Sequence, residues 1–215
     1  MSSRSYGAEP ISLGIVDAKF GEFCYVQDMP IALPNKAIVL PVGLMPADPL
    51  INLAMSDLED LVGNEDFDTN YVYLTVKHLP VRAGSYITRP GWHADSFGSD
   101  DITYIWSNVV PTEFSIQPFT LSQDCDLSLA QMEEQAVNVT VYGDKFLLRL
   151  DQFCIHRPGP VLKDCVRTFV KITFSKRIFA LEGNAKNPLI PTDWIYQPRR
   201  KERNHPWGKS STTGQ

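Results

Sequence analysis

The chain has 215 residues, of which 43% are hydrophobic and 21% charged, a composition typical of a folded globular domain and unlike that of a disordered chain. Its 20 Lys and Arg residues against 25 Asp and Glu residues give a net charge of −5, which disfavours general binding to nucleic acid. No apolar run approaches the roughly 18 residues of a membrane-spanning helix, so we expect no membrane span.

The N-terminus and the cysteines indicate the compartment. Residues 1–7 lack the apolar core of a secretory signal, so we expect a cytoplasmic protein. The four cysteines, at positions 24, 125, 154 and 165, include no C-x-x-C pair. We therefore expect reduced thiols rather than disulfides or a zinc ribbon.

Short strands dominate the predicted elements. The first are expected at 11–17, 23–27 and 37–41. A helix follows over 49–62, with Asp48 as its cap, Pro49 at its first position and Gly63 after its end. A shorter helix is expected at 128–136, with Ser128 and Gln131 spaced as in a capping box. The remaining strands are predicted at 71–77, 85–89, 102–109, 137–142, 145–150, 153–156 and 167–175. This pattern predicts a mainly β sandwich or barrel with a few flanking helices.

The chain divides into one domain and a tail. Residues 1–187 are predicted to form the domain, with its core at about 70–180. Residues 188–215 contain prolines and the basic run 199–203. This tail is either a solvated segment laid along the domain or an anchor for an acidic partner, which keeps nucleic acid as a possible partner. The sequence predicts no oligomeric state.

Two histidines and one aspartate form the candidate chemical site. His93 and Asp95 stand two residues apart, so on an extended strand their side chains would share one face and could chelate one cation. His156 comes 63 residues later. Two histidines and one carboxylate on one face of a metal form the ligand set of non-haem Fe(II) oxygenases, in which the opposite face stays open.

An arginine follows the second histidine. Arg167 begins an expected strand 11 residues after His156, and its planar guanidinium suits a carboxylate held by two hydrogen bonds. Each residue also has a simpler interpretation. His93 could be structural, His156 could belong to a turn, and Arg167 could form a surface salt bridge.

In these segments the chain resembles the Fe(II)/2-oxoglutarate-dependent dioxygenase superfamily. The residues that carry the resemblance lie at 91–95, 150–160 and 167–175, and it covers roughly residues 70 to 180. The resemblance implies a double-stranded β-helix, which is a jelly-roll barrel. It also implies that His93, Asp95 and His156 bind Fe(II) and that Arg167 binds the far carboxylate of the co-substrate 2-oxoglutarate.

The resemblance further implies an oxygenase that releases succinate and CO₂ and hydroxylates a small molecule or a protein side chain. No catalytic residues are expected beyond the metal ligands. Further co-substrate contacts are expected from Tyr86, Arg89, Tyr104 and Asn108, and Arg82, Arg89 and Lys171 are the substitute anchors should Arg167 not serve.

One feature of the last strand sets a condition on this assignment. Val170, Ile172 and Phe174 alternate out of phase with Arg167, so the apolar face of the strand is not the arginine's face. The assignment then needs a helix over the apolar face, for instance the one at 49–62.

Two other classes of function use the same strand pattern. One is a jelly-roll binding, structural or assembly protein without catalysis, and the other is a cupin-like metalloenzyme that needs no 2-oxoglutarate. Iron content separates the first from an oxygenase, and succinate release separates the second.

Overall fold

The computed structural model describes residues 5–85 and 91–198. The basic run 199–203 and most of the predicted strand at 85–89 lie outside these residues. The described elements in chain order are β1 (Ile11–Ile15), β2 (Cys24–Ala32), η1 (Val42–Ala47), α1 (Asp48–Val62), α2 (Asn64–Asp68), β3 (Tyr71–Val81), β4 (Ile102–Ser107), β5 (Glu113–Phe114), α3 (Cys125–Gln135), β6 (Thr140–Val141), β7 (Phe146–Leu150), β8 (His156–Arg157) and β9 (Cys165–Ser175).

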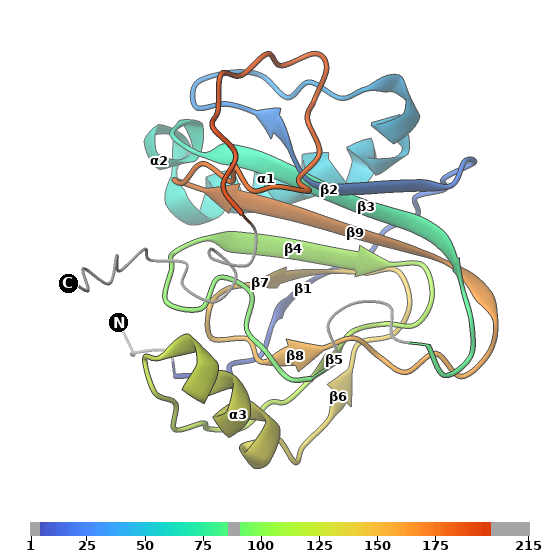
Figure 1. Ribbon diagram of the computed structural model, residues 1–215, viewed down its shortest axis with the longest axis vertical. Coiled ribbons are helices and arrows are strands. Elements are labelled where there is room, and N and C mark those ends of the chain that lie inside the picture. Colours follow the sequence, from blue (N-terminus) through green and yellow to red (C-terminus); the bar gives the residue numbers. More distant parts are fainter. Residues whose placement is uncertain (1–4, 86–90, 199–215) are drawn as a thin grey trace, which may run out of the picture.

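Two antiparallel sheets with a few helices make up the mainly β fold that the sequence predicted (Figure 1). The large sheet has the order β1-β7-β4-β9-β3-β2, and the small sheet has the order β6-β5-β8. Among the described strands, no hydrogen-bonded ladder joins the two sheets, so a closed barrel is not formed.

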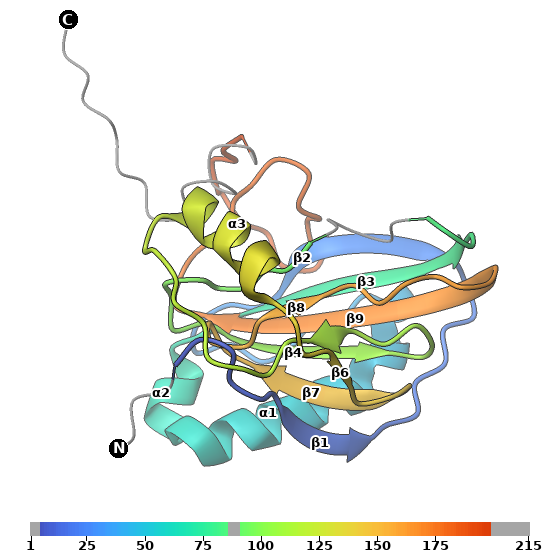
Figure 2. The same ribbon diagram turned by 90° about the horizontal axis from the view of Figure 1, so that it is seen from below.

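The apolar face of the large sheet packs against α1. Val170, Ile172 and Phe174 of β9 are buried in one cluster with Leu50 and Ile51 of α1. The alternation seen in the sequence is thereby explained, because the face of β9 that does not carry Arg167 is covered by a helix. Helix α3 lies on the other side of the large sheet, with the small sheet (Figure 2).

Several predicted elements differ from the observed ones. The expected strand at 37–41 is irregular chain, although the Val39 amide still donates to the Ile31 carbonyl at 2.7 Å. The cap of α3 is Asp124, whose side chain accepts from the amides of Asp126 and Leu127, so the capping box predicted at Ser128 was wrong. The segment expected as a strand at 153–156 is a turn that leads into β8.

The chain after β9 runs back over the sheet. The Ala185 amide donates to the Gln27 carbonyl at 2.8 Å, and Trp194 lies 5.9 Å from the ring of Tyr71. The described chain after β9 therefore contacts strands β2 and β3. All four cysteines are free, and none of the described helices is long and apolar enough to cross a bilayer.

The packing of β9 under α1 gives a stability test. Ile172 is fully buried, so Ile172→Ala should lower the free energy of unfolding by about 2–5 kcal/mol through lost burial and a residual cavity. Leu162→Ala is the control, because it removes the same number of carbon atoms from a side chain that is 84% exposed. It should change the free energy of unfolding by less than about 0.5 kcal/mol. Urea denaturation measures both, and equal effects would contradict the packing described here.

Candidate metal centre

A short backbone bridge brings the two histidines together. The His93 amide donates to the His156 carbonyl at 2.9 Å, and the His156 amide donates to the His93 carbonyl at 2.8 Å. This antiparallel pair extends the small sheet beside β8, and the two imidazole rings lie 4.5 Å apart between centroids. Residues 63 positions apart in sequence thus become direct neighbours.

Backbone carbonyls select the tautomer of both imidazoles. Nδ1 of His93 lies 3.0 Å from the Gly91 carbonyl oxygen, and Nδ1 of His156 lies 3.0 Å from that of Cys154. A carbonyl only accepts, so each Nδ1 carries a proton, and Nε2 is the ring nitrogen that remains to bind a metal. Histidines oriented in this way are typical of metal ligands.

Asp95 completes the cluster. One ligand atom from each of His93, Asp95 and His156 lies within 4.8 Å of the others, and Asp95 Oδ1 is 3.9 Å from His93 Nε2. The expected extended strand is absent, because the chain enters a turn at Asp95 and Ser96 adopts a positive φ of 62°. The aspartate therefore joins the site through a turn and not through the alternation of a strand.

The charges around Asp95 favour its ionised form. Burial by itself would raise the pKa of this carboxyl, but the charges of Lys171 and of the two histidines outweigh burial and hold that pKa well below its ordinary value. Lys171 Nζ lies 3.8 Å from Asp95 Oδ2. Two imidazoles and one carboxylate gathered in this way are a donor set that fits a divalent transition metal with open coordination positions.

Neighbouring contacts hold the segment that carries His93. The Trp92 amide donates to Glu133 of α3 at 3.0 Å. The Trp92 ring is buried beside Met132 and Ile155, and the guanidinium of Arg157 lies 4.4 Å from its centroid. These contacts fix the backbone on which the first histidine stands.

The candidate metal ligands line a cavity of about 580 Å³ between the two sheets. Arg167 lines the same cavity and is only 4% exposed. Its Nε donates to the Val110 carbonyl at 3.1 Å, and its guanidinium lies 5.0 Å from the ring of Phe169. Burial lowers the pKa of Arg167 to about 10, which leaves it charged at neutral pH.

Two of the four other predicted co-substrate contacts, Tyr104 and Asn108, do not line this cavity. Tyr104 lies on the opposite face of β4, in the cluster under α1, where its hydroxyl donates to Asp57 at 2.7 Å. Asn108 bonds the backbone of β9, accepting from the Thr168 amide at 2.6 Å and donating to the Val166 carbonyl. Tyr86 and Arg89 lie outside the described residues. The predicted co-substrate contacts of Tyr104 and Asn108 were wrong. A shift of one residue along a strand moves a side chain to the opposite face of the sheet.

Sequence reasoning missed several charged residues of the cavity. Lys171 was expected only as a substitute anchor, and Lys77 and Asp28 were not considered. The signal for Lys171 was present, because it stands four residues after Arg167 and so shares its face of β9. To place Lys77 and Asp28 in the cavity, one has to know that β3 pairs with both β9 and β2.

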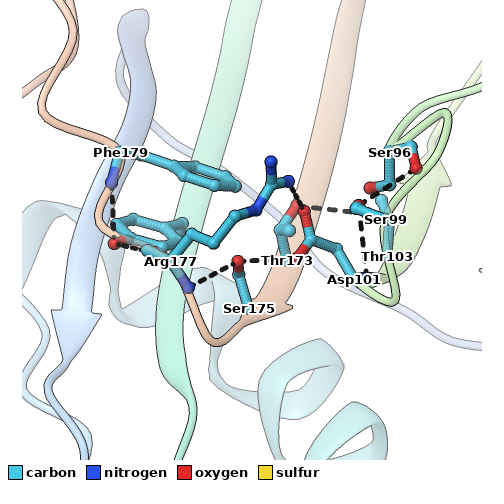
Figure 3. Close-up of polar contacts among 9 residues, drawn as sticks. Ser96, Ser99, Asp101, Thr103, Thr173, Ser175, Arg177 and Phe179 are labelled. Carbon is cyan, nitrogen blue, oxygen red and sulfur yellow. Dashed lines mark hydrogen bonds and ion pairs between the residues drawn. The ribbon is translucent and has the colours of Figure 1, made fainter. Parts of the chain in front are cut away.

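A polar network forms part of the cavity lining (Figure 3). Asp101, which is 5% exposed, pairs with Arg177 and accepts from the Ser175 hydroxyl at 2.6 Å. The hydroxyls of Thr103 and Thr173 lie 3.3 Å apart beside it. Arg177 and Phe179 belong to the chain after β9 and also line the cavity, so this network ties that chain to the site.

Comparison with known proteins gives a limited likeness. No family model and no curated protein matches the chain. Among solved structures, EvdO2 from Micromonospora carbonacea var. aurantiaca is similar with a TM-score of 0.40 and 16% identity over 60% of this chain and 61% of that one. The same protein complexed with 2-oxoglutarate gives a TM-score of 0.40 and 14% identity, over 60% and 64% of the two chains. The chain thus spans less than two thirds of these structures.

The geometry of the cluster predicts one metal ion per chain. Under anaerobic equilibrium dialysis, the protein should take up one Fe(II), and Asp95→Ala or His156→Ala should abolish tight binding by removing one of three ligands. Asp100→Ala is the matched control, because Asp100 is exposed and belongs to no such cluster among the described residues. Unchanged affinity in both ligand variants would show that these residues are not the ligands.

Proposed function

We propose that the protein is an Fe(II)- and 2-oxoglutarate-dependent oxygenase that acts on a small molecule. The observation that carries the proposal is the meeting of His93, Asp95 and His156 in a cavity that Arg167 also lines. Fe(II) held by this ligand set would supply the activation of O₂, with 2-oxoglutarate as the source of two electrons. The overall reaction converts 2-oxoglutarate, O₂ and a C–H bond into succinate, CO₂ and a C–OH group.

The role of each side chain follows from its surroundings. His93 and His156 present Nε2 because their Nδ1 protons are held by backbone carbonyls. Asp95 supplies the negative charge of the ligand set, and Lys171 orients it from 3.8 Å. These contacts preorganise the donors, so little ordering is required when a metal binds.

Arg167 is proposed to hold the carboxylate of 2-oxoglutarate that does not reach the metal. A buried carboxylate without a partner costs several kcal/mol, whereas a guanidinium offers two charge-assisted hydrogen bonds. Arg167 is itself buried, and its donor contact among the described residues is a single carbonyl bonded through Nε. The terminal nitrogens of its guanidinium are therefore available for this role.

The decisive experiment removes the arginine. Arg167→Ala should retain Fe(II) but weaken 2-oxoglutarate binding more than about a hundredfold, because one partner of a buried ion pair is worth about 3–5 kcal/mol. Arg167→Lys should restore binding only partly, since an ammonium lacks the planar fork. The measurements are succinate formation and co-substrate titration through the absorption band of the iron–keto-acid complex.

Arg82→Ala is the control, because Arg82 is exposed and does not line the cavity. If the wild-type protein forms succinate and Arg167→Ala does so with unchanged apparent affinity, the carboxylate is held elsewhere. If the wild-type protein binds iron but consumes no 2-oxoglutarate, it is a different metalloenzyme. A protein that binds no metal would instead be a jelly-roll binding module.

A further inference from the structure

Three cationic side chains of the large sheet face the cavity: Lys77, Arg167 and Lys171, here called the cationic wall. Lys77 of β3 stands opposite Phe169 of β9, and Arg167 and Lys171 stand two residues before and after Phe169. Lys77 is therefore the diagonal neighbour of both other cations on the same face of the sheet.

Lys77 differs from the other two members in its partners. Lys171 lies 3.5 Å from Asp28 and 3.8 Å from Asp95. Arg167 already has a proposed role toward the co-substrate. Among the described residues, no carboxylate lies within 4.0 Å of Lys77 Nζ, and its closest recorded contact is the ring of Tyr25, 5.3 Å from its centroid.

The surroundings of Lys77 disfavour its charge. Burial, then the charge of Lys171 and to a smaller extent that of Arg167, lower the pKa of Lys77 to about 8, although the carboxylates of Asp28 and Asp95 act in the opposite direction. A half-buried ammonium beside two other cations is a site that an incoming anion would stabilise.

The charge balance of the cavity leaves room for one more anion. Of the carboxylates that the described part of the chain places in the cavity lining, Asp28 and Asp95 would face the cationic wall and a divalent metal ion, since Asp101 and Arg177 neutralise each other. The dianion 2-oxoglutarate would compensate two of the three remaining positive charges. One positive charge then stays without a counterion in a cavity partly shielded from water.

The position of Lys77 suits the substrate rather than the co-substrate. Arg167 is 4% exposed, whereas Tyr25, which lines the cavity beside Lys77, is 56% exposed. The Lys77 end of the cationic wall therefore lies toward the solvent-accessible edge of the cavity, at β2, where a substrate can enter after the deeper site is filled.

We propose that Lys77, backed by the ring of Tyr25, anchors an anionic group of the small-molecule substrate, a carboxylate or a phosphate. This proposal names the substrate class of the oxygenase proposed above, and calling the bound anion a substrate rests on that function. The anion subsite itself does not depend on iron or 2-oxoglutarate.

Chemical labelling of the metal-free wild-type protein tests the subsite directly. Acetylation of Lys77 at pH 8 is followed by mass spectrometry, with the exposed Lys36 as internal reference. Benzoate or inorganic phosphate should slow labelling of Lys77 more than about tenfold, because an ion pair moves its pKa from about 8 toward the ordinary 10.4. Benzamide has the shape of benzoate without the charge and should have no effect.

Equal labelling of Lys77 with and without both anions would overturn the proposal, and protection by only one of them identifies which anion the subsite takes.

A variant separates the substrate anchor from the co-substrate anchor. With Zn(II) and saturating 2-oxoglutarate present, Lys77→Met should weaken benzoate binding at least about tenfold in calorimetric titration, while Lys36→Met should not change it. The affinity for 2-oxoglutarate should stay within about twofold in Lys77→Met. A loss of 2-oxoglutarate affinity as large as in Arg167→Ala would assign Lys77 to the co-substrate and overturn the proposal. If the wild-type protein binds no 2-oxoglutarate, the proposed function fails, and the labelling result still decides the anion subsite.

Discussion

The two unlike faces of β9 are the constraint on which the rest of the structure depends. This strand lies between β4 and β3 in the large sheet, so both of its edges are paired. One face puts Val170, Ile172 and Phe174 under α1, and the other puts Arg167 and Lys171 into the cavity. Each buried apolar side chain contributes about 1.5–3 kcal/mol, which offsets the cost of holding cations on the opposite face. A shift of register by one residue would exchange the two faces and destroy both the core and the site.

The candidate metal centre depends on a second, much smaller contact. Two backbone hydrogen bonds between His93 and His156 set the separation of the imidazoles, and two carbonyls set their tautomers. The donors are thus positioned by backbone atoms, which move less than side chains. Such positioning needs no closed barrel, because the small sheet and the bridge beside β8 already face the large sheet across the cavity.

Charge, more than shape, distinguishes the cavity. Most protein cavities that bind small molecules are lined mainly by apolar groups with a few polar ones. Here one wall carries Lys77, Arg167 and Lys171, and among the described residues Asp28 and Asp95 are the carboxylates nearest to it. Inside a protein the electrostatic energy of such a cluster is larger than in water, so the cavity favours ligands that bring negative charge.

The sequence by itself determined the strands β3 and β9, the helix α1 and the identity of the candidate ligands. These features depend on local patterns: alternating β-branched residues, apolar residues at helical spacing, and two ligand-type residues two positions apart. It also set a condition for the assignment of Arg167, that a helix cover the opposite face of β9, and α1 meets that condition. Local patterns failed where tertiary contacts override propensity, as in the irregular segment at 37–41 and in the turn that carries Asp95.

Only the tertiary structure decided which residues share the cavity. Tyr104 faces the core although its neighbours Thr103 and Ile105 line the cavity, since the faces of β4 are assigned by its pairing with β9. Lys77 joins the cationic wall because β3 pairs with β9 at one particular register. Sequence specifies which residues alternate along a strand, but the register between strands depends on contacts far apart in the chain. The candidate ligand set could therefore be proposed from residue types and spacing, whereas the charged wall opposite it required the fold.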